Sequence, residues 1–98
     1  MNTFIVTGGN RGLGFEIARH LAANSETRVV IAARSLDRGQ EAARQIGSNV
    51  WARELDLADR GSVDRFTASW DGPIAGLVNN AGVQYADSRH FTDDGIEE

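Results

Sequence analysis

The feature that most constrains this chain is a glycine-rich turn between a short apolar run and an amphipathic segment. The turn reads Thr7-Gly8-Gly9-Asn10-Arg11-Gly12-Leu13-Gly14 and directly follows Phe4-Ile5-Val6. Glycine lets the backbone come close to a ligand, because no Cβ stands in the way. Such a turn at the start of a helix also directs unpaired N–H groups toward one place, where an anion can bind. The pattern therefore predicts a phosphate-binding strand–turn–helix unit.

The rest of the chain alternates between strand-like and helix-like patterns with short connections. We expect strands at 3–7, 28–33, 50–55 and 74–79, and helices at 12–24, 35–46 and 60–70. This alternation favours a parallel sheet with helices on its faces. Right-handed crossovers would place the strands in the order 3-2-1-4. We therefore predict an α/β fold built on part of a doubly wound parallel sheet.

Residues that favour helix ends support these boundaries. Ser35 and Asp59 are good N-cap residues for the second and third helices, and Gly47 can end the second helix. The helical period of that second segment places Leu36, Ala43 and Ile46 on one face. We expect this face to pack against the sheet.

Composition excludes several classes of function. The 98 residues, 41% of them hydrophobic, fit one small globular domain. A net charge of −4 gives no reason to expect nucleic acid as a partner. Without cysteine, and with only two isolated histidines, the sequence predicts no metal site. Neither a membrane span nor a signal peptide is recognisable, so we expect no membrane partner and a cytoplasmic location.

Two glycine-containing motifs together point to a family. The pattern T-G-x-x-x-G-x-G, with Gly8, Gly12 and Gly14, resembles that of the short-chain dehydrogenase/reductases. Asn79-Asn80-Ala81-Gly82 follows another apolar run and is similar to the N-N-A-G motif of the same family. The resemblance implies a Rossmann fold that binds a dinucleotide, and a hydride transfer to or from a carbonyl or alcohol. A P-loop is excluded, because that motif needs a lysine and this chain has none.

The resemblance also implies a set of cofactor-binding residues. The glycines would form the pyrophosphate turn, with Gly14 allowing the helix to approach the sheet; a tight turn without a ligand is the alternative. The amides of the second motif would line the adenine-ribose side and brace the sheet. The full candidate set is Gly8, Asn10, Arg11, Gly12, Leu13, Gly14, Arg34, Ser35, Asp56, Leu57, Asn79, Asn80, Ala81 and Gly82.

The end of the second strand predicts which dinucleotide is preferred. An NAD site usually carries Asp or Glu there, but this chain has Arg34 and Ser35. The planar guanidinium of Arg34 suits a 2′-phosphate, and Arg11 adds a second cation. We therefore predict NADP as the cofactor, with NAD less favoured. The alternative is that both arginines are solvated surface residues.

Asp56 and Leu57 follow the third strand. The resemblance implies that the acidic residue contacts the adenine edge. A turn or capping aspartate explains the same position equally well, because aspartate commonly hydrogen-bonds the backbone two residues on. Both interpretations stay open at this point.

The catalytic residues of the family are missing. The resemblance implies a mechanism in which a tyrosine acts as general acid, assisted by a lysine four residues later and by a serine. Tyr85 is the only tyrosine, Arg89 stands where the lysine would be, and Tyr85 follows the second motif too closely. We therefore predict no catalytic residue, and we interpret residues 1–98 as the N-terminal cofactor-binding part of the domain without its catalytic half. The tail Thr92–Glu97 resembles retinol-dehydrogenase-like and protochlorophyllide-reductase-like members.

Two other functions fit the same pattern. One is a standalone, non-enzymatic nucleotide-binding or sensor module on this fold. The other is an enzyme such as a methyltransferase, but that class usually needs a carboxylate where Arg34 stands. In a partial sheet the fourth strand would form an apolar edge, so we also expect self-association through residues 74–79.

Overall fold

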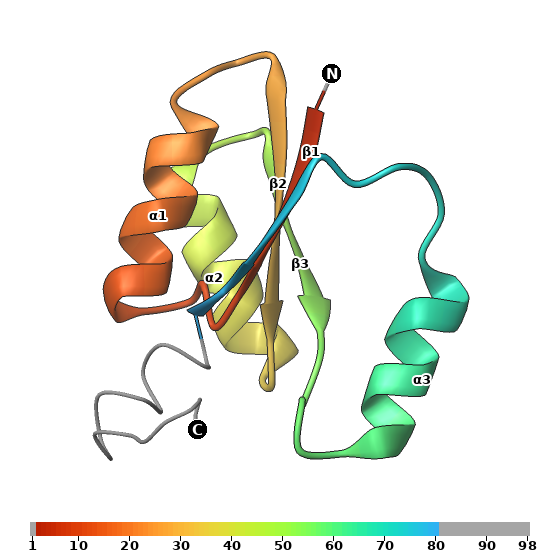
Figure 1. Ribbon diagram of the computed structural model, residues 1–98. Coiled ribbons are helices and arrows are strands. Elements are labelled where there is room, and N and C mark those ends of the chain that lie inside the picture. Colours follow the sequence, from red (N-terminus) through yellow and green to blue (C-terminus); the bar gives the residue numbers. More distant parts are fainter. Residues whose placement is uncertain (1, 81–98) are drawn as a thin grey trace, which may run out of the picture.

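The computed structural model describes residues 2–80, which form an alternating α/β unit (Figure 1). The elements are β1 (Asn2–Thr7), α1 (Gly12–Ala22), β2 (Thr27–Ala33), α2 (Leu36–Ile46), β3 (Val50–Glu54), α3 (Arg60–Ser69) and β4 (Gly76–Asn79). All strand pairs are parallel, and the order is β3-β2-β1-β4. Helices α1 and α2 cover one face of the sheet and α3 lies on the other. The predicted fold class and strand order are confirmed.

Each face of the sheet has its own apolar core, because successive side chains of a strand point to opposite faces. On the side of α1 and α2, the core is built around Val6, Val29 and Ile31. On the side of α3, Ile5 and Val30 pack with neighbouring apolar residues. Strand β2 is therefore buried on both faces, as its β-branched run predicts.

The predicted helix caps are confirmed. The Ser35 hydroxyl accepts a hydrogen bond from the backbone N–H of Arg38, and the Asp59 carboxylate accepts from Gly61 and Ser62. Gly47 caps the end of α2. Capping residues therefore define these helix boundaries, and the predicted helix ends differ from the observed ones by only a few residues.

The prediction that Leu36 packs inward is wrong, since its side chain is 39% exposed. The buried face of α2 is centred on Gly39, Ala42 and Ala43. A Cβ added at Gly39 would lie 3.2 Å from the Cβ of Ala52, so the helix lies very close to β3. Small residues make this approach possible, and Leu36 lies at the margin of the buried face in the first turn.

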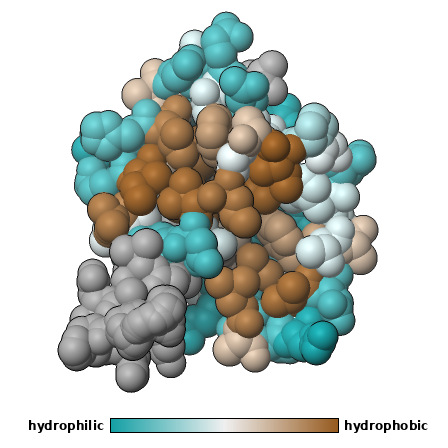
Figure 2. Space-filling view, viewed as in Figure 1, coloured by the Kyte–Doolittle hydropathy of each residue, from teal (hydrophilic) through white to brown (hydrophobic). Residues whose placement is uncertain are grey.

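Strand β4 is the open edge of the described sheet beside β1. Leu77 is 65% exposed and Ile74 is 45% exposed. Figure 2 shows apolar surface gathered on the side of the molecule where β4 lies in front. The structure therefore leaves a large apolar surface at this edge among residues 2–80.

No helix in the described part of the chain is both long enough and apolar enough to cross a lipid bilayer.

Candidate functional site

The glycine turn between β1 and α1 adopts backbone conformations that require glycine. Gly8 has φ 66° and Gly12 has φ 61°, both in the left-handed region. The N–H of Gly8 donates to the carbonyl of Ala32 at 2.8 Å, which holds the turn against β2. The turn is therefore fixed at the carboxyl end of the sheet, beside the position where β2 ends.

Gly14 is needed for close packing. A Cβ at this position would lie 2.4 Å from the carbonyl oxygen of Gly8 and 2.6 Å from Nδ2 of Asn80. Real Cβ atoms do not approach backbone oxygen so closely, so any side chain would push α1 away from the turn. This geometry agrees with the packing role predicted for Gly14.

The N-terminus of α1 is open to an anion. Arg11 occupies the N-cap position with extended backbone and makes no side-chain capping bond. The first turn of the helix contains no acidic residue. Because the first N–H groups of a helix have no partners within the helix, they and the helix dipole favour an anion at this point.

A hollow of about 750 Å³ lies at the carboxyl ends of β1, β2 and β3. Its walls come from the glycine turn, the β2–α2 connection and the segment after β3. Seven of the predicted site residues line it: Gly8, Asn10, Arg11, Arg34, Ser35, Asp56 and Leu57. Residues far apart in the sequence therefore meet at one edge of the sheet, because the carboxyl ends of parallel strands lie together.

The asparagines at the end of β4 lie behind the turn and do not line the hollow. Asn80 is fully buried and donates from Nδ2 to the carbonyl of Gly8 at 3.3 Å. The Thr7 hydroxyl lies 3.3 Å from both the carbonyl of Val78 and Oδ1 of Asn79. These bonds join β1, β4 and the turn, which agrees with the bracing role predicted for this motif.

The remaining predicted residues fall into two groups. Gly12, Leu13 and Gly14 form the start of α1 beside the hollow and do not line it. Ala81 and Gly82 lie outside the described residues, as do Tyr85 and the tail 92–97.

Three arginines line the hollow, and the sequence predicts two of them. Arg11 and Arg34 were predicted, and Arg38 in the first turn of α2 is the third. A cation in a first turn opposes the helix dipole, which was the available signal for Arg38. Within residues 2–80 the ion pairs are Glu16–Arg19 and Glu41–Arg44, so none of the three is paired with a described carboxylate.

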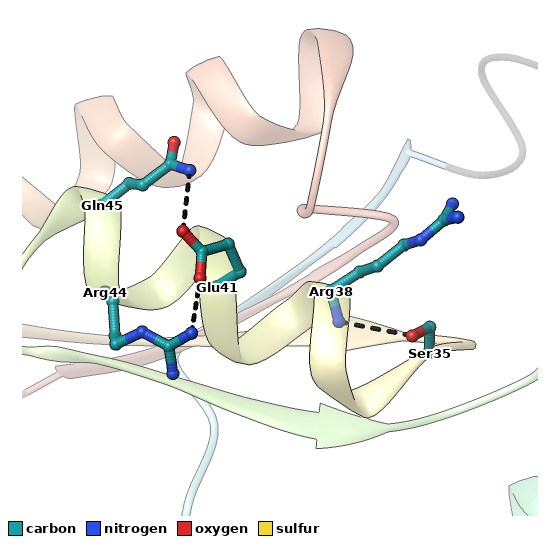
Figure 3. Close-up of polar contacts among 5 residues, drawn as sticks. All are labelled: Ser35, Arg38, Glu41, Arg44 and Gln45. Carbon is teal, nitrogen blue, oxygen red and sulfur yellow. Dashed lines mark hydrogen bonds and ion pairs between the residues drawn. The ribbon is translucent and has the colours of Figure 1, made fainter.

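On α2, the carboxylate of Glu41 is bound by residues other than Arg38. Glu41 accepts hydrogen bonds from Arg44 and Gln45 (Figure 3). In the same view the Arg38 side chain extends away from Glu41. The hydrogen bond from Arg44, helped by that from Gln45, lowers the pKa of Glu41 below its usual range. Glu41 therefore pairs with Arg44 and not with Arg38, which lines the hollow.

Asp56 fits the turn interpretation and also lines the hollow. Its Oδ1 accepts from the backbone N–H of Ala58 at 3.0 Å, and its own N–H donates to the Ser62 hydroxyl at 2.8 Å. These bonds fix the segment after β3, so that Leu57 stands 48% exposed at the rim.

The described residues contain no group of three or more metal-ligating side chains.

Comparison with known proteins decides the family. Residues 2–98 match the family model described as short chain dehydrogenase. The chain belongs to this family. The family predicted from the two motifs is therefore confirmed.

Relatives within the family share this region of the chain. Mouse (Mus musculus) retinol dehydrogenase 11 is 42% identical over 87 residues, which cover 81% of this chain and 27% of that protein. Polyprenol dehydrogenase of Danio rerio is 40% identical over 101 residues, covering 95% and 31%. The chain spans about a third of the length of the curated relatives it matches.

Among solved structures, the Pseudomonas aeruginosa RhlG/NADP active-site complex has a TM-score of 0.68 and 29% identity, over 80% of this chain and 33% of that one. The family uses NAD(P) dinucleotides. The residues present fit such a group, because the glycine turn and the arginines line one hollow and the uncapped start of α1 lies beside it.

Proposed function

We propose that this chain is the NADP(H)-binding part of a short-chain oxidoreductase, and that the whole protein moves a hydride between NADP(H) and a carbonyl or alcohol. Residues 1–98 would form the N-terminal part of the Rossmann domain, with the catalytic residues elsewhere in the protein. The observation that carries the proposal is the convergence of Arg11, Arg34 and Arg38 on the hollow at the end of β2.

The glycine turn and the start of α1 would hold the pyrophosphate. Gly8 and Gly12 keep side chains away from it, and the uncapped N–H groups of α1 supply donors. Asn80 would position the turn from behind through its bond to the Gly8 carbonyl. This role uses backbone groups, so it suits any dinucleotide.

The arginines would decide between the two dinucleotides. The last residue of β2 is Ala33, followed by Arg34 and Ser35, so no carboxylate stands at the position that binds ribose hydroxyls in NAD sites. A 2′-phosphate would meet guanidinium groups there, and charge-assisted bonds of this kind contribute about 1.5–3 kcal/mol each. The adenine would lie against Leu57 near Asp56. The NADP named in the RhlG complex supports this choice by analogy.

Titration of the folded chain with NADP and with NAD tests the proposal. We expect NADP to bind at least about tenfold more tightly, because a single charge-assisted contact is worth that much. Arg34→Asp should remove most of the preference, and Arg38→Gln should remove part of it. Arg44→Gln is the matched control, since Arg44 pairs with Glu41 and does not line the hollow.

Equal affinities in the unmodified chain would refute the NADP preference. Loss of preference in Arg44→Gln as well would show that net charge, and not the geometry of the hollow, is responsible. Absence of binding by either dinucleotide in a folded chain would refute the proposed site itself.

A further inference from the structure

A second hollow, of about 600 Å³, lies between the sheet and the end of α3. Its floor comes from the amino-terminal halves of β1 and β2 and from residues 51–53 of β3, and its wall from the end of α3 and the turn that follows. Arg28 in this hollow and Arg34 in the first are six residues apart on one extended strand, which corresponds to roughly 20 Å. The two hollows share no lining residue.

Two tryptophans, Trp51 and Trp70, line this second hollow, and Phe66 holds Trp70 from outside the lining. Phe66 and Trp70 stack with ring centroids 5.7 Å apart, and Nε1 of Trp70 donates to the carbonyl of Gly72 at 2.9 Å. Trp51 is opposite Val30 in the register of β3 on β2, and it is 47% exposed. The hollow thus offers two indole surfaces, one fixed by α3 and one by the edge strand.

Two arginines are held by these rings and not by carboxylates. The guanidinium carbon of Arg28 lies 5.3 Å from the ring centre of Trp51. That of Arg53 lies 4.9 Å from Phe66 and 5.6 Å from Trp70, and its guanidinium also donates to the Ser69 hydroxyl. A cation–π contact positions a guanidinium without neutralising its charge or occupying all of its donors.

The charge balance of the hollow is positive although the whole chain is acidic. Its lining contains the two arginines and one acidic residue, Asp71. The ion pairs within residues 2–80 lie on α1 and α2, so neither arginine forms one with a described carboxylate. Positioned cations beside an exposed indole ring, Trp51, and a half-buried one, Trp70, match a ligand that combines a negative charge with a flat apolar body.

We propose that this hollow binds a small aromatic carboxylate, with its anionic group on Arg28 and Arg53 and its ring against Trp51 and Trp70. The site is independent of the dinucleotide hollow and of the function proposed for it. It requires both features of the ligand, because the guanidiniums recognise the charge and the indoles recognise the ring.

The chain supplies its own reporter, since Trp51 and Trp70 are its only tryptophans. Benzoate is the probe, with uncharged benzamide as the ring control and acetate as the charge control. We expect benzoate to change the tryptophan fluorescence saturably, with a dissociation constant in the millimolar range or below. Benzamide and acetate should each bind at least about tenfold more weakly. The variants Trp51→Phe and Trp70→Phe assign the signal to each ring.

Substitutions separate this site from general electrostatics. Arg28→Gln and Arg53→Gln should each weaken benzoate about tenfold, and Arg19→Gln on α1 should leave its affinity unchanged. Because Arg28 is exposed, Arg28→Gln keeps the test valid if Arg53→Gln disturbs α3. Saturating NADP should not displace benzoate. No saturable response, equal affinity for benzoate and benzamide, or equal weakening by Arg19→Gln would overturn the proposal.

Discussion

Asn80, just after β4, donates its side-chain amide to the carbonyl oxygen of Gly8 across 3.3 Å, although 72 positions separate the two residues. Asn80 is fully buried, and among residues 2–80 its Oδ1 has no hydrogen-bond partner. The same Nδ2 lies 2.6 Å from where a Cβ of Gly14 would stand. Asn80 therefore packs the end of β4 against both the glycine turn and the start of α1. A change at this position should alter both the stability of the fold and the shape of the site.

Replacing Asn80 should weaken this contact in a graded way. Asn80→Ala removes the donor to the Gly8 carbonyl, and we expect the free energy of unfolding to fall by about 1–3 kcal/mol. Asn80→Asp should cost more, because it buries a carboxylate against a carbonyl oxygen. Urea unfolding measures both changes, with exposed Gln45→Ala as control. An Asn80→Asp variant as stable as the unmodified chain would contradict this account.

Gly14→Ala should disrupt the turn. The added Cβ would meet the Gly8 carbonyl at 2.4 Å, so α1 must move and we expect lower stability together with much weaker dinucleotide binding. Gly61→Ala is the matched control in α3, where the new Cβ meets only the flexible end of Arg65 and the Asp59 carboxylate. That substitution should be neutral or stabilise by up to about 1 kcal/mol. Thermal unfolding and NADP titration of both variants measure the contrast.

The exposed edge at β4 should make the isolated chain self-associate. Leu77→Lys places a charge on this edge and should shift sedimentation toward the monomer, whereas Leu36→Lys on α2 should not. Bound dinucleotide should stabilise the folded state by up to about 2.7 kcal/mol at a hundredfold excess over its dissociation constant. A chain that stays monomeric at high concentration without ligand would refute self-association and favour a standalone module.

Glu41 should contribute a small, pH-dependent stabilisation. Its hydrogen bonds from Arg44 and Gln45 lower its pKa in the folded state relative to the unfolded state. The contribution is therefore present above the unfolded-state pKa and is lost as pH falls through the folded-state pKa. Carboxyl NMR titration of the folded chain measures the shift, and Glu41→Gln should remove this part of the acid dependence. A Glu41 pKa in the folded chain equal to that of an unpaired glutamate would refute the pairing.

The chain alone should not reduce carbonyl compounds. The family's tyrosine–lysine pair is missing, and Tyr85, which lies outside the described residues, is followed by Arg89 in place of a lysine. An assay with NADPH and a panel of aldehydes and ketones should stay at background. Turnover that disappears in Tyr85→Phe would show that this residue is catalytic.

Several properties of this protein are determined by residues that lie close together in the sequence. The glycine spacing from Gly8 to Gly14 predicts the turn, and alternating apolar patterns predict the order of strands and helices. Ser35 and Asp59 mark helix starts because a capping side chain bonds backbone groups only two or three residues away. Such signals need no knowledge of distant contacts, which is why the fold and most of the residues around the first hollow could be predicted.

Other properties depend on which segments the sheet brings together. Arg38 lines the first hollow because α2 begins at the end of β2, and Leu36 stays exposed although the helical period places it with Ala43 and Ile46. The bond from Asn80 to Gly8 and the meeting of Arg28 with Trp51 join residues from different elements. The periodicity of a segment holds no information on its distance from other elements. Only the tertiary structure could therefore decide these contacts.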